Sequence, residues 1–235
     1  MVWLSTSRAL TEASRPSVLH SQGLKGLIGG LAPEARPLVL DLGAPLAANL
    51  EFLLTLSCRV RIADLHRSLG AERPEDREPE AIGALLERLL PLAPGERFDA
   101  VLAWDVLDYL RAHEVSALLG RLAPACPPGA PMLVLASTRR AIPATPVRYR
   151  ILDAGTISCE GSDEPSRAGP HYTQHDLGRM MAGFSVMRSV VLRGGIQEYL
   201  FVRVARAEPA PGTRPDTRPT GGAPPPRPWF RRRPV

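Results

Sequence analysis

The sequence between residues 37 and 65 reads as a strand, a helix and a second strand, and this pattern constrains the fold more than any other part of the chain. Residues 37–42 form a continuous apolar run that ends at an acid and a glycine, as expected for a strand buried on both faces. Residues 45–56 have leucines at helical spacing and a proline in the first turn, where proline is tolerated. Residues 58–65 alternate apolar residues with arginines before an acid. A helix between two strands in so short a stretch predicts a βαβ unit of a parallel sheet.

The rest of the 235-residue chain continues this alternation of helices and strands. The pattern predicts helices at 17–31, at 81–90 and within 106–122, and a short helix through residue 181 that Thr173 and Asp176 would cap. It predicts buried strands at 98–104 and 132–136, a hairpin at 147–160, and strands at 184–192 and 196–204. Polar loops are expected at 68–80 and 161–170. The order predicts an α/β fold. We expect a three-layer α/β/α sandwich with a mostly parallel sheet and a C-terminal antiparallel hairpin.

Composition divides the chain into an N-terminal helical extension (residues 1–36), an α/β domain (residues 37–206) and a proline- and arginine-rich tail (residues 207–235) that we expect to be disordered. The tail has six arginines against Glu208 and Asp216, so it carries +4 of the net charge of +5. A nearly neutral body argues against a broad phosphate-binding surface. We therefore expect no contact with nucleic acid or an acidic partner unless the tail makes it, and for the tail a solvated chain end is the favoured interpretation.

Cysteine content and hydropathy exclude several other classes of protein. The three cysteines are far apart and form no Cys-x-x-Cys pair, so neither a disulfide framework nor a zinc site is indicated. No apolar run reaches the ~20 residues needed to span a bilayer. The first 16 residues lack the continuous apolar segment of a secretory signal. We therefore expect a soluble cytoplasmic protein that has no membrane partner.

The residues at the ends of the expected strands indicate where a ligand would bind. In open α/β sheets, ligands bind beyond the carboxyl ends of the strands, where the strand order reverses. Gly43 would let a ligand approach the backbone, and the helix N-terminus after it favours an anionic group. Asp64 ends the second strand 21 residues later and could accept hydrogen bonds from two ribose hydroxyls. Asp105 ends the next buried strand. This arrangement fits an adenosine-containing ligand.

Five segments in this order resemble the class I S-adenosylmethionine-dependent methyltransferases. The loop DLGAPLA (residues 41–47) is similar to the family's acid-x-Gly-x-Gly-x-Gly loop, with proline and alanine in place of the later glycines. The other four are Asp64, FDAVLAWDVLDYL (residues 98–110), LAPACPPGAPMLVLAS (residues 122–137) and HYTQHDLGRMMAGFSV (residues 171–186). The resemblance implies a Rossmann-like methyltransferase fold with a degenerate glycine-rich motif. Only one clear helix lies between residues 64 and 98, so the sheet could lack its third, edge strand.

The resemblance also implies a cofactor, S-adenosylmethionine, and the residues around it. The methionine carboxylate would lie near Gly43, the ribose would bind Asp64, and the methyl sulfonium would face the cleft near Asp105. The implied cofactor-binding residues are Asp41, Gly43, Ala44, Asp64, Trp104 and Asp105. Methyl transfer is a direct displacement in which positioning contributes most of the acceleration. The family keeps no fixed catalytic residue, so the sequence identifies none.

Several of these residues also have a purely structural interpretation. Asp41 could bond only to the amides of its own loop, and Asp64 could be a solvated strand end. Asp105 could cap the helix that follows it. Trp104 could belong to the core or to a pocket wall. Asn49, on the first expected helix, is expected to be a buried packing residue and not a cofactor contact.

Two functions of different classes follow from the sequence. The first is an S-adenosylmethionine-dependent methyltransferase that acts on an unidentified small molecule or protein. The alternative is a catalytically inactive methyltransferase-fold module for binding or regulation. A nicotinamide-dependent dehydrogenase is disfavoured because the first turn lacks the G-x-G-x-x-G motif. We expect residues 138–170 to determine the acceptor, since the family carries substrate-covering insertions there.

Overall fold

The computed structural model describes residues 16–160 and 165–205, and these are built around a six-stranded sheet. Its strand order is β10-β11-β5-β4-β2-β3. The strands are β2 (Leu38–Asp41), β3 (Arg59–Ile62), β4 (Ala100–Trp104), β5 (Pro131–Ser137), β10 (Phe184–Leu192) and β11 (Ile196–Arg203). β2, β3, β4 and β5 run parallel to one another, whereas β11 is antiparallel to both β5 and β10.

This topology confirms the predicted fold class, a mostly parallel sheet that ends in an antiparallel hairpin. The described chain forms no strand between β3 and β4, so β3 is the edge of the sheet and the third strand is lacking. Two helices, α4 (Leu65–Gly70) and α5 (Ile82–Leu89), and the short 3-10 helix η2 (Pro74–Arg77) occupy that part of the sequence. The expected loop at residues 68–80 is therefore partly helical.

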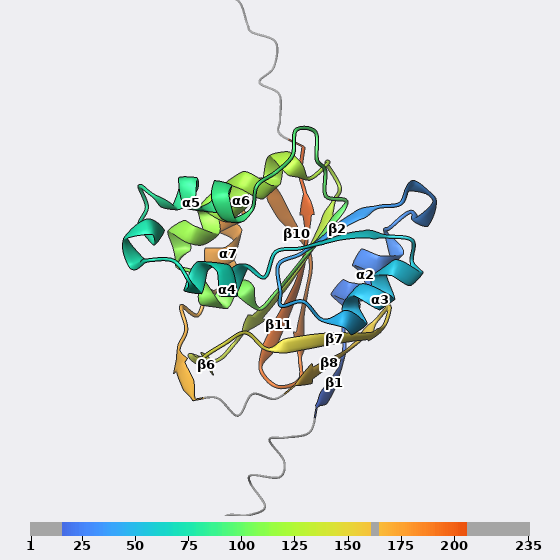
Figure 1. The fold of residues 1–235 in the computed structure, drawn as a ribbon. Coiled ribbons are helices and arrows are strands. Elements are labelled where there is room, and N and C mark those ends of the chain that lie inside the picture. Colours follow the sequence, from blue (N-terminus) through green and yellow to red (C-terminus); the bar gives the residue numbers. More distant parts are fainter. Residues whose placement is uncertain (1–15, 161–164, 206–235) are drawn as a thin grey trace, which may run out of the picture. The chain divides into compact units, whose positions relative to one another are not determined.

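Helices cover both faces of the sheet (Figure 1), and successive residues of a strand pack on opposite layers. In β2, Leu38 and Leu40 pack with α4, α5, α6 (Ala112–Ala125) and α7 (Gln174–Met180). Val39 packs on the opposite face with α2 (Gln22–Gly29) and α3 (Ala47–Thr55). Because successive strand residues point to opposite faces, a strand that is apolar throughout requires two helical layers.

The helix expected over residues 17–31 is correct only in its second part. Ser17–His20 forms strand β1, and α2 begins at Gln22 after an N-cap at Ser21. Glu198 fixes this start: one of its oxygens accepts a hydrogen bond from the Ser21 hydroxyl, and the other accepts one from the Gly23 amide at 2.7 Å. The apolar residues before the helix pair with a strand far away in the sequence, so helical spacing alone was misleading there.

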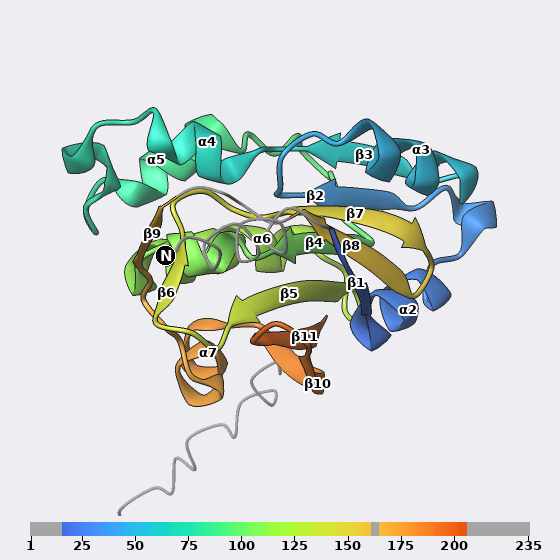
Figure 2. The same cartoon turned by 90° about the horizontal axis from the view of Figure 1, so that it is seen from below.

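The expected hairpin at residues 147–160 is confirmed as β7 (Arg148–Asp153) and β8 (Thr156–Glu160). With β1 it forms a three-stranded antiparallel sheet, the accessory sheet, in the order β1-β8-β7. Figures 1 and 2 both show this sheet on the side of α2 and α3. Residues 161–170 were expected to be a loop, but β9 (Ser166–Ala168) pairs there with β6 (Ala141–Pro143).

Two local predictions are also confirmed. The N-terminus of α7 is a capping box in which the Thr173 hydroxyl accepts from the Asp176 amide and the Asp176 carboxylate accepts from the Thr173 amide. The helical region after β4 is a pair, the 3-10 helix η3 (Val106–Tyr109) followed by α6. The tail prediction for residues 207–235 lies outside the described residues. Among those described, no helix is long and apolar enough to cross a membrane.

Asn49 fastens the accessory sheet to the main fold, which is the packing role expected from the sequence. Its side chain donates to the Tyr149 carbonyl and accepts from the Ile151 amide, both at 2.8 Å. The side chain is 2% exposed, so neither backbone group has water as a substitute partner.

Replacing Asn49 with alanine should therefore destabilise the fold. The Asn49→Ala variant would leave a buried amide and a buried carbonyl of β7 without partners, which should lower the free energy of unfolding by about 1–3 kcal/mol. Urea denaturation measures this change. Glu51→Ala, an exposed position of the same helix, should change it by less than about 0.5 kcal/mol. Equal effects of the two substitutions would contradict the anchoring role.

Candidate functional site

Trp104 is the centre of the site at the carboxyl ends of β2 and β4. It ends β4 with a backbone φ of +48°, a left-handed conformation that is rare for a bulky residue. The ladder to β5 shifts register between Leu102 and Trp104. This irregularity turns the indole towards β2, where its Nε1 donates to the Asp41 Oδ1 at 2.8 Å.

Gly43 is the position that accommodates this indole. A Cβ atom on Gly43 would lie 2.6 Å from the Trp104 Cδ1, closer than real Cβ contacts come. The sequence predicts that Gly43 lets a ligand approach the backbone. In the structure, the absence of a side chain makes room for Trp104, which therefore lies where the resemblance would place the methionine end of the cofactor.

Tyr149 of the accessory sheet covers the other side of the indole. The two rings are stacked with centroids 5.7 Å apart and an interplanar angle of 8°. Burial raises the pKa of the Tyr149 hydroxyl well above its ordinary value, and Asp105 raises it further. The sequence does not predict Tyr149 as a site residue, because the packing of β7 against α3 is not visible in the pattern of either segment.

Asp41 is 2% exposed and lies beneath Trp104. Its Oδ1 also accepts a hydrogen bond from the Gly43 amide at 2.9 Å. This is the contact with an amide of its own loop that the purely structural interpretation of Asp41 predicts. Burial raises the pKa of Asp41 to about 6, against the lowering effect of its bonds to Gly43 and Trp104. Both donors therefore favour the ionised form, which desolvation disfavours.

Asp105 and Asp108 are two further buried carboxylates beyond β4. Asp105 makes no side-chain bond to the following 3-10 helix, so it is not the cap considered from the sequence. Its Oδ2 instead accepts from the Val147 amide at 2.9 Å, and the Asp108 Oδ2 accepts from the Ser137 amide at 2.6 Å. Burial raises the pKa of Asp105 to about 8 and that of Asp108 to about 7.

Residues 144–147, which join β6 to β7, cross over these strand ends, and we refer to them as the strap. The strap is tied at two points. The Val147 amide donates to Asp105, and the Tyr109 hydroxyl donates to the Thr145 carbonyl at 2.8 Å. Its residues line each of the cavities beyond the strands. The strap lies within residues 138–170, the stretch expected to determine the acceptor.

The larger cavity has a volume of about 540 Å³, within the range that takes drug-sized ligands. It brings together three of the predicted site residues, Gly43, Ala44 and Asp64. The remaining wall comes from the loop after β2, from α4 and η3, and from the strap and the first residue of β7. Its residues are Leu42, Pro45, Leu46, His66, Arg67, Gly70, Val106, Thr145, Pro146 and Arg148.

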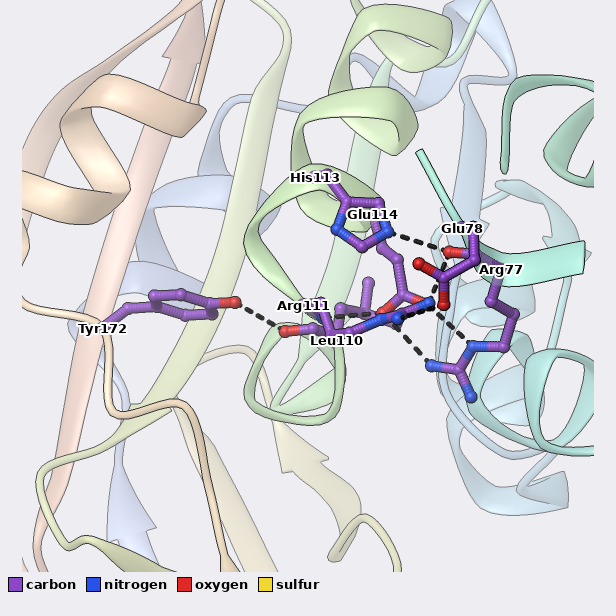
Figure 3. Close-up of polar contacts among 7 residues, drawn as sticks. All are labelled: Arg77, Glu78, Leu110, Arg111, His113, Glu114 and Tyr172. Atoms are coloured by element: carbon purple, nitrogen blue, oxygen red, sulfur yellow. Dashed lines mark hydrogen bonds and ion pairs between the residues drawn. The ribbon is translucent and has the colours of Figure 1, made fainter. Parts of the chain in front are cut away.

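A neighbouring cavity of about 490 Å³ shares His66 and Gly70 with the larger one. Arg77 and Arg111 line it, and both belong to an ion-pair network with Glu78 and Glu114 (Figure 3). Arg77 of η2 makes a two-point contact with Glu114 of α6, at 2.7 and 3.1 Å. Burial alone would raise the pKa of Glu114, but hydrogen bonds from Arg77 and from the Arg111 amide lower it below its ordinary value.

The two predicted residues at the end of β4 lie at a narrow void of about 20 Å³, which Pro146 and Val147 of the strap also line. Trp104 and Asp105 line this void together with Gly43 and Tyr149. Gly43 thus borders both the void and the larger cavity, whereas Asp64 borders only the larger one. Of all the predicted site residues, Asp41 is the one bonded to Trp104. No group of three His, Cys, Asp or Glu side chains in the described segments could bind a metal ion.

No family model and no curated protein matches this chain. Solved structures with a similar chain path include the S-adenosylmethionine-bound amino pentose methyltransferase CalS10 from Micromonospora echinaspora, with 14% identity over 87% of this chain and 99% of that chain and a TM-score of 0.44. The N-methyltransferase NodS from Bradyrhizobium japonicum WM9, in complex with S-adenosylhomocysteine, has 17% identity over 77% and 84% and a TM-score of 0.43. At these TM-scores, the fold assignment rests on strand order and register.

The buried carboxylates should make stability depend on pH. Their pKa values are raised in the folded state, so between about pH 4 and about pH 8 the folded chain binds protons that the unfolded chain has released. The free energy of unfolding should therefore fall as the pH rises through this interval.

The Asp105→Asn variant should show a smaller fall than the parent chain, measured by urea denaturation at intervals of one pH unit. Asparagine keeps the acceptor for the Val147 amide but has no proton to lose. A parent profile that rises between pH 5 and pH 8, or an identical profile for the variant, would contradict the burial of an ionisable Asp105.

Proposed function

We propose that this chain is an S-adenosylmethionine-dependent methyltransferase that acts on a small-molecule acceptor. The larger cavity is the observation that carries the proposal. It lies at the carboxyl ends of β2 and β3, and the glycine loop after the first of these strands and the acid after the second line it together. Strand ends of this kind are where open α/β sheets bind nucleotide-type ligands.

The cavity residues fit the nucleoside half of the cofactor. Asp64 would accept hydrogen bonds from the ribose hydroxyls, and Leu42 and Val106 provide apolar wall for the base. Bound there, the cofactor supplies an electrophilic methyl group. The chain's own contribution is to orient the nucleoside, to exclude water with the strap and to position an acceptor in line, and positioning of this kind lowers the barrier of a displacement most.

The methionine half fits only when Trp104 leaves Gly43. The indole is held there by one hydrogen bond, to Asp41, by its stack on Tyr149, and by its place in the buried core on the side of α2 and α3. Rotation of the indole would free the Gly43 backbone and the N-terminal turn of α3, where a carboxylate is favoured. We infer that cofactor binding displaces Trp104.

Binding of S-adenosylhomocysteine tests the proposal by calorimetric titration. The parent chain should bind it, and Asp64→Asn should bind about tenfold or more weakly, because the variant loses the charge that strengthens the ribose hydrogen bonds. Glu34→Gln, an exposed acid outside the cavities, is the matched control and should bind as the parent does. Absence of binding at millimolar ligand, or an Asp64→Asn variant as tight as the parent, would overturn the proposal.

A second candidate is the catalytically inactive methyltransferase-fold module, and the position of Trp104 favours it. If the indole permanently fills the space beside Gly43, the parent chain cannot take the methionine half. The Trp104→Ala variant separates the two candidates. If the chain is a methyltransferase in which Trp104 moves, the parent should bind S-adenosylhomocysteine and the variant should bind it severalfold more tightly. Binding by the variant alone would instead favour the inactive module.

A further inference from the structure

A separate cavity of about 230 Å³ lies beyond β4 and β5, with Val147 of the strap in its wall. Asp105 and Asp108 line it, together with Tyr109, Ser137 and Tyr149. Its volume is below the range typical of drug-sized ligands, so any occupant has few heavy atoms. Apolar wall is available from Ile142 and Pro143 of β6 and from Ile196 of β11.

The two carboxylates are not neutralised by the protein. Each uses one oxygen to accept a backbone amide, from Val147 for Asp105 and from Ser137 for Asp108. Arg139 also lines the cavity but is exposed, and no ion pair joins it to either carboxylate. With both carboxylates ionised, the charged groups that line the cavity therefore sum to a negative charge.

Asp105 has one oxygen that nothing in the described chain satisfies. Its side chain is 5% exposed, and its Oδ1 is buried without a hydrogen-bond partner. A buried polar atom of this kind is costly in a folded protein and points to an absent partner. For the ionised carboxylate such a partner is a hydrogen-bond donor, and a cationic donor between two carboxylates also favours their ionised form, against the burial that raises the pKa of Asp105 to about 8.

We propose that this cavity binds a small amine as its ammonium ion, with Asp105 and Asp108 as the recognising carboxylates. This amine would be the methyl acceptor, a role that rests on the proposed function. The narrow void supports that role, because it borders both sites. Asp105, Val147 and Tyr149 line the void and the small cavity, whereas Gly43, Pro146 and Arg148 line the void and the larger cavity.

Trp104 lies at this void, between the proposed amine site and the proposed cofactor site. The displacement that would open the methionine end of the cofactor site would therefore also join the two sites. An acceptor nitrogen at Asp105 would then lie beside the void that borders the larger cavity, with Pro146 and Val147 of the strap in the wall of that void. Such a position would bring the acceptor next to the methyl group, as a displacement reaction requires.

The same carboxylates suit the proton transfer that an amine acceptor needs. An ammonium ion has no lone pair, so it must first give one proton to a carboxylate oxygen of Asp105 or Asp108. The nitrogen lone pair then forms a bond to the methyl carbon, the bond between sulfur and that carbon breaks, and its electron pair stays on sulfur. The methylated ammonium ion leaves and the carboxylic acid returns its proton to water. Burial brings both pKa values near neutrality, where such a base is effective.

Titration with n-propylammonium chloride tests the amine site, with 1-propanol as the uncharged ligand of the same size. The full chain should bind the ammonium ion in the absence of any cofactor and should not bind the alcohol. Asp105→Asn and Asp108→Asn should each weaken binding by about tenfold or more, since a charged hydrogen-bond partner is lost.

Asp99→Asn is the matched control. Asp99 also accepts a backbone amide, that of Leu38, but at the opposite end of β4, so its variant should bind as the parent does. Equal binding of 1-propanol, unchanged binding by the Asp105 and Asp108 variants, or no binding of the ammonium ion by the parent would overturn the amine site.

These outcomes are distinguishable from failure of the proposed function. A chain that binds S-adenosylhomocysteine but not n-propylammonium retains the proposed function and loses the amine site. A chain that binds n-propylammonium through the two carboxylates but never binds S-adenosylhomocysteine retains the amine site and loses the methyltransferase proposal.

Discussion

The hydrogen bond between the Trp104 indole and the Asp41 carboxylate joins the ends of two neighbouring parallel strands, and the rest of the site is arranged around it. The indole requires glycine at position 43 and provides the surface on which Tyr149 stacks. Tyr149 in turn belongs to β7, which Asn49 fastens to α3. One side chain thus links the main sheet, the accessory sheet and the glycine loop, and its position decides which cavities are open.

The sequence predicted the sheet well because its strands are buried on both faces and read as continuous apolar runs. Val39 and Leu40 pack on opposite faces, which only a three-layer arrangement allows. Even the lack of a third strand was indicated, by a charged segment without an apolar run. The structure adds an ion pair between that segment and α6, from Arg77 to Glu114, which lie 37 positions apart and have no recognisable local pattern.

The site was predictable only in outline. Gly43 and Asp64 do line one cavity, as expected for residues at the carboxyl ends of adjacent strands. The role of Trp104 was not predictable, because a left-handed backbone at a bulky residue follows from a register shift between strands. The strap was also invisible, since it is fixed by contacts to Asp105 and Tyr109 that are 42 and 36 positions distant along the chain.

A crystal structure of the chain with S-adenosylhomocysteine tests the central claim most directly, which is that the cofactor binds at the larger cavity by displacing Trp104. The account predicts the ribose on Asp64, the amino-acid end beside Gly43, and the indole rotated away from Asp41. A ligand bound elsewhere, or one bound at Asp64 while the indole keeps its contact with Asp41, would contradict it.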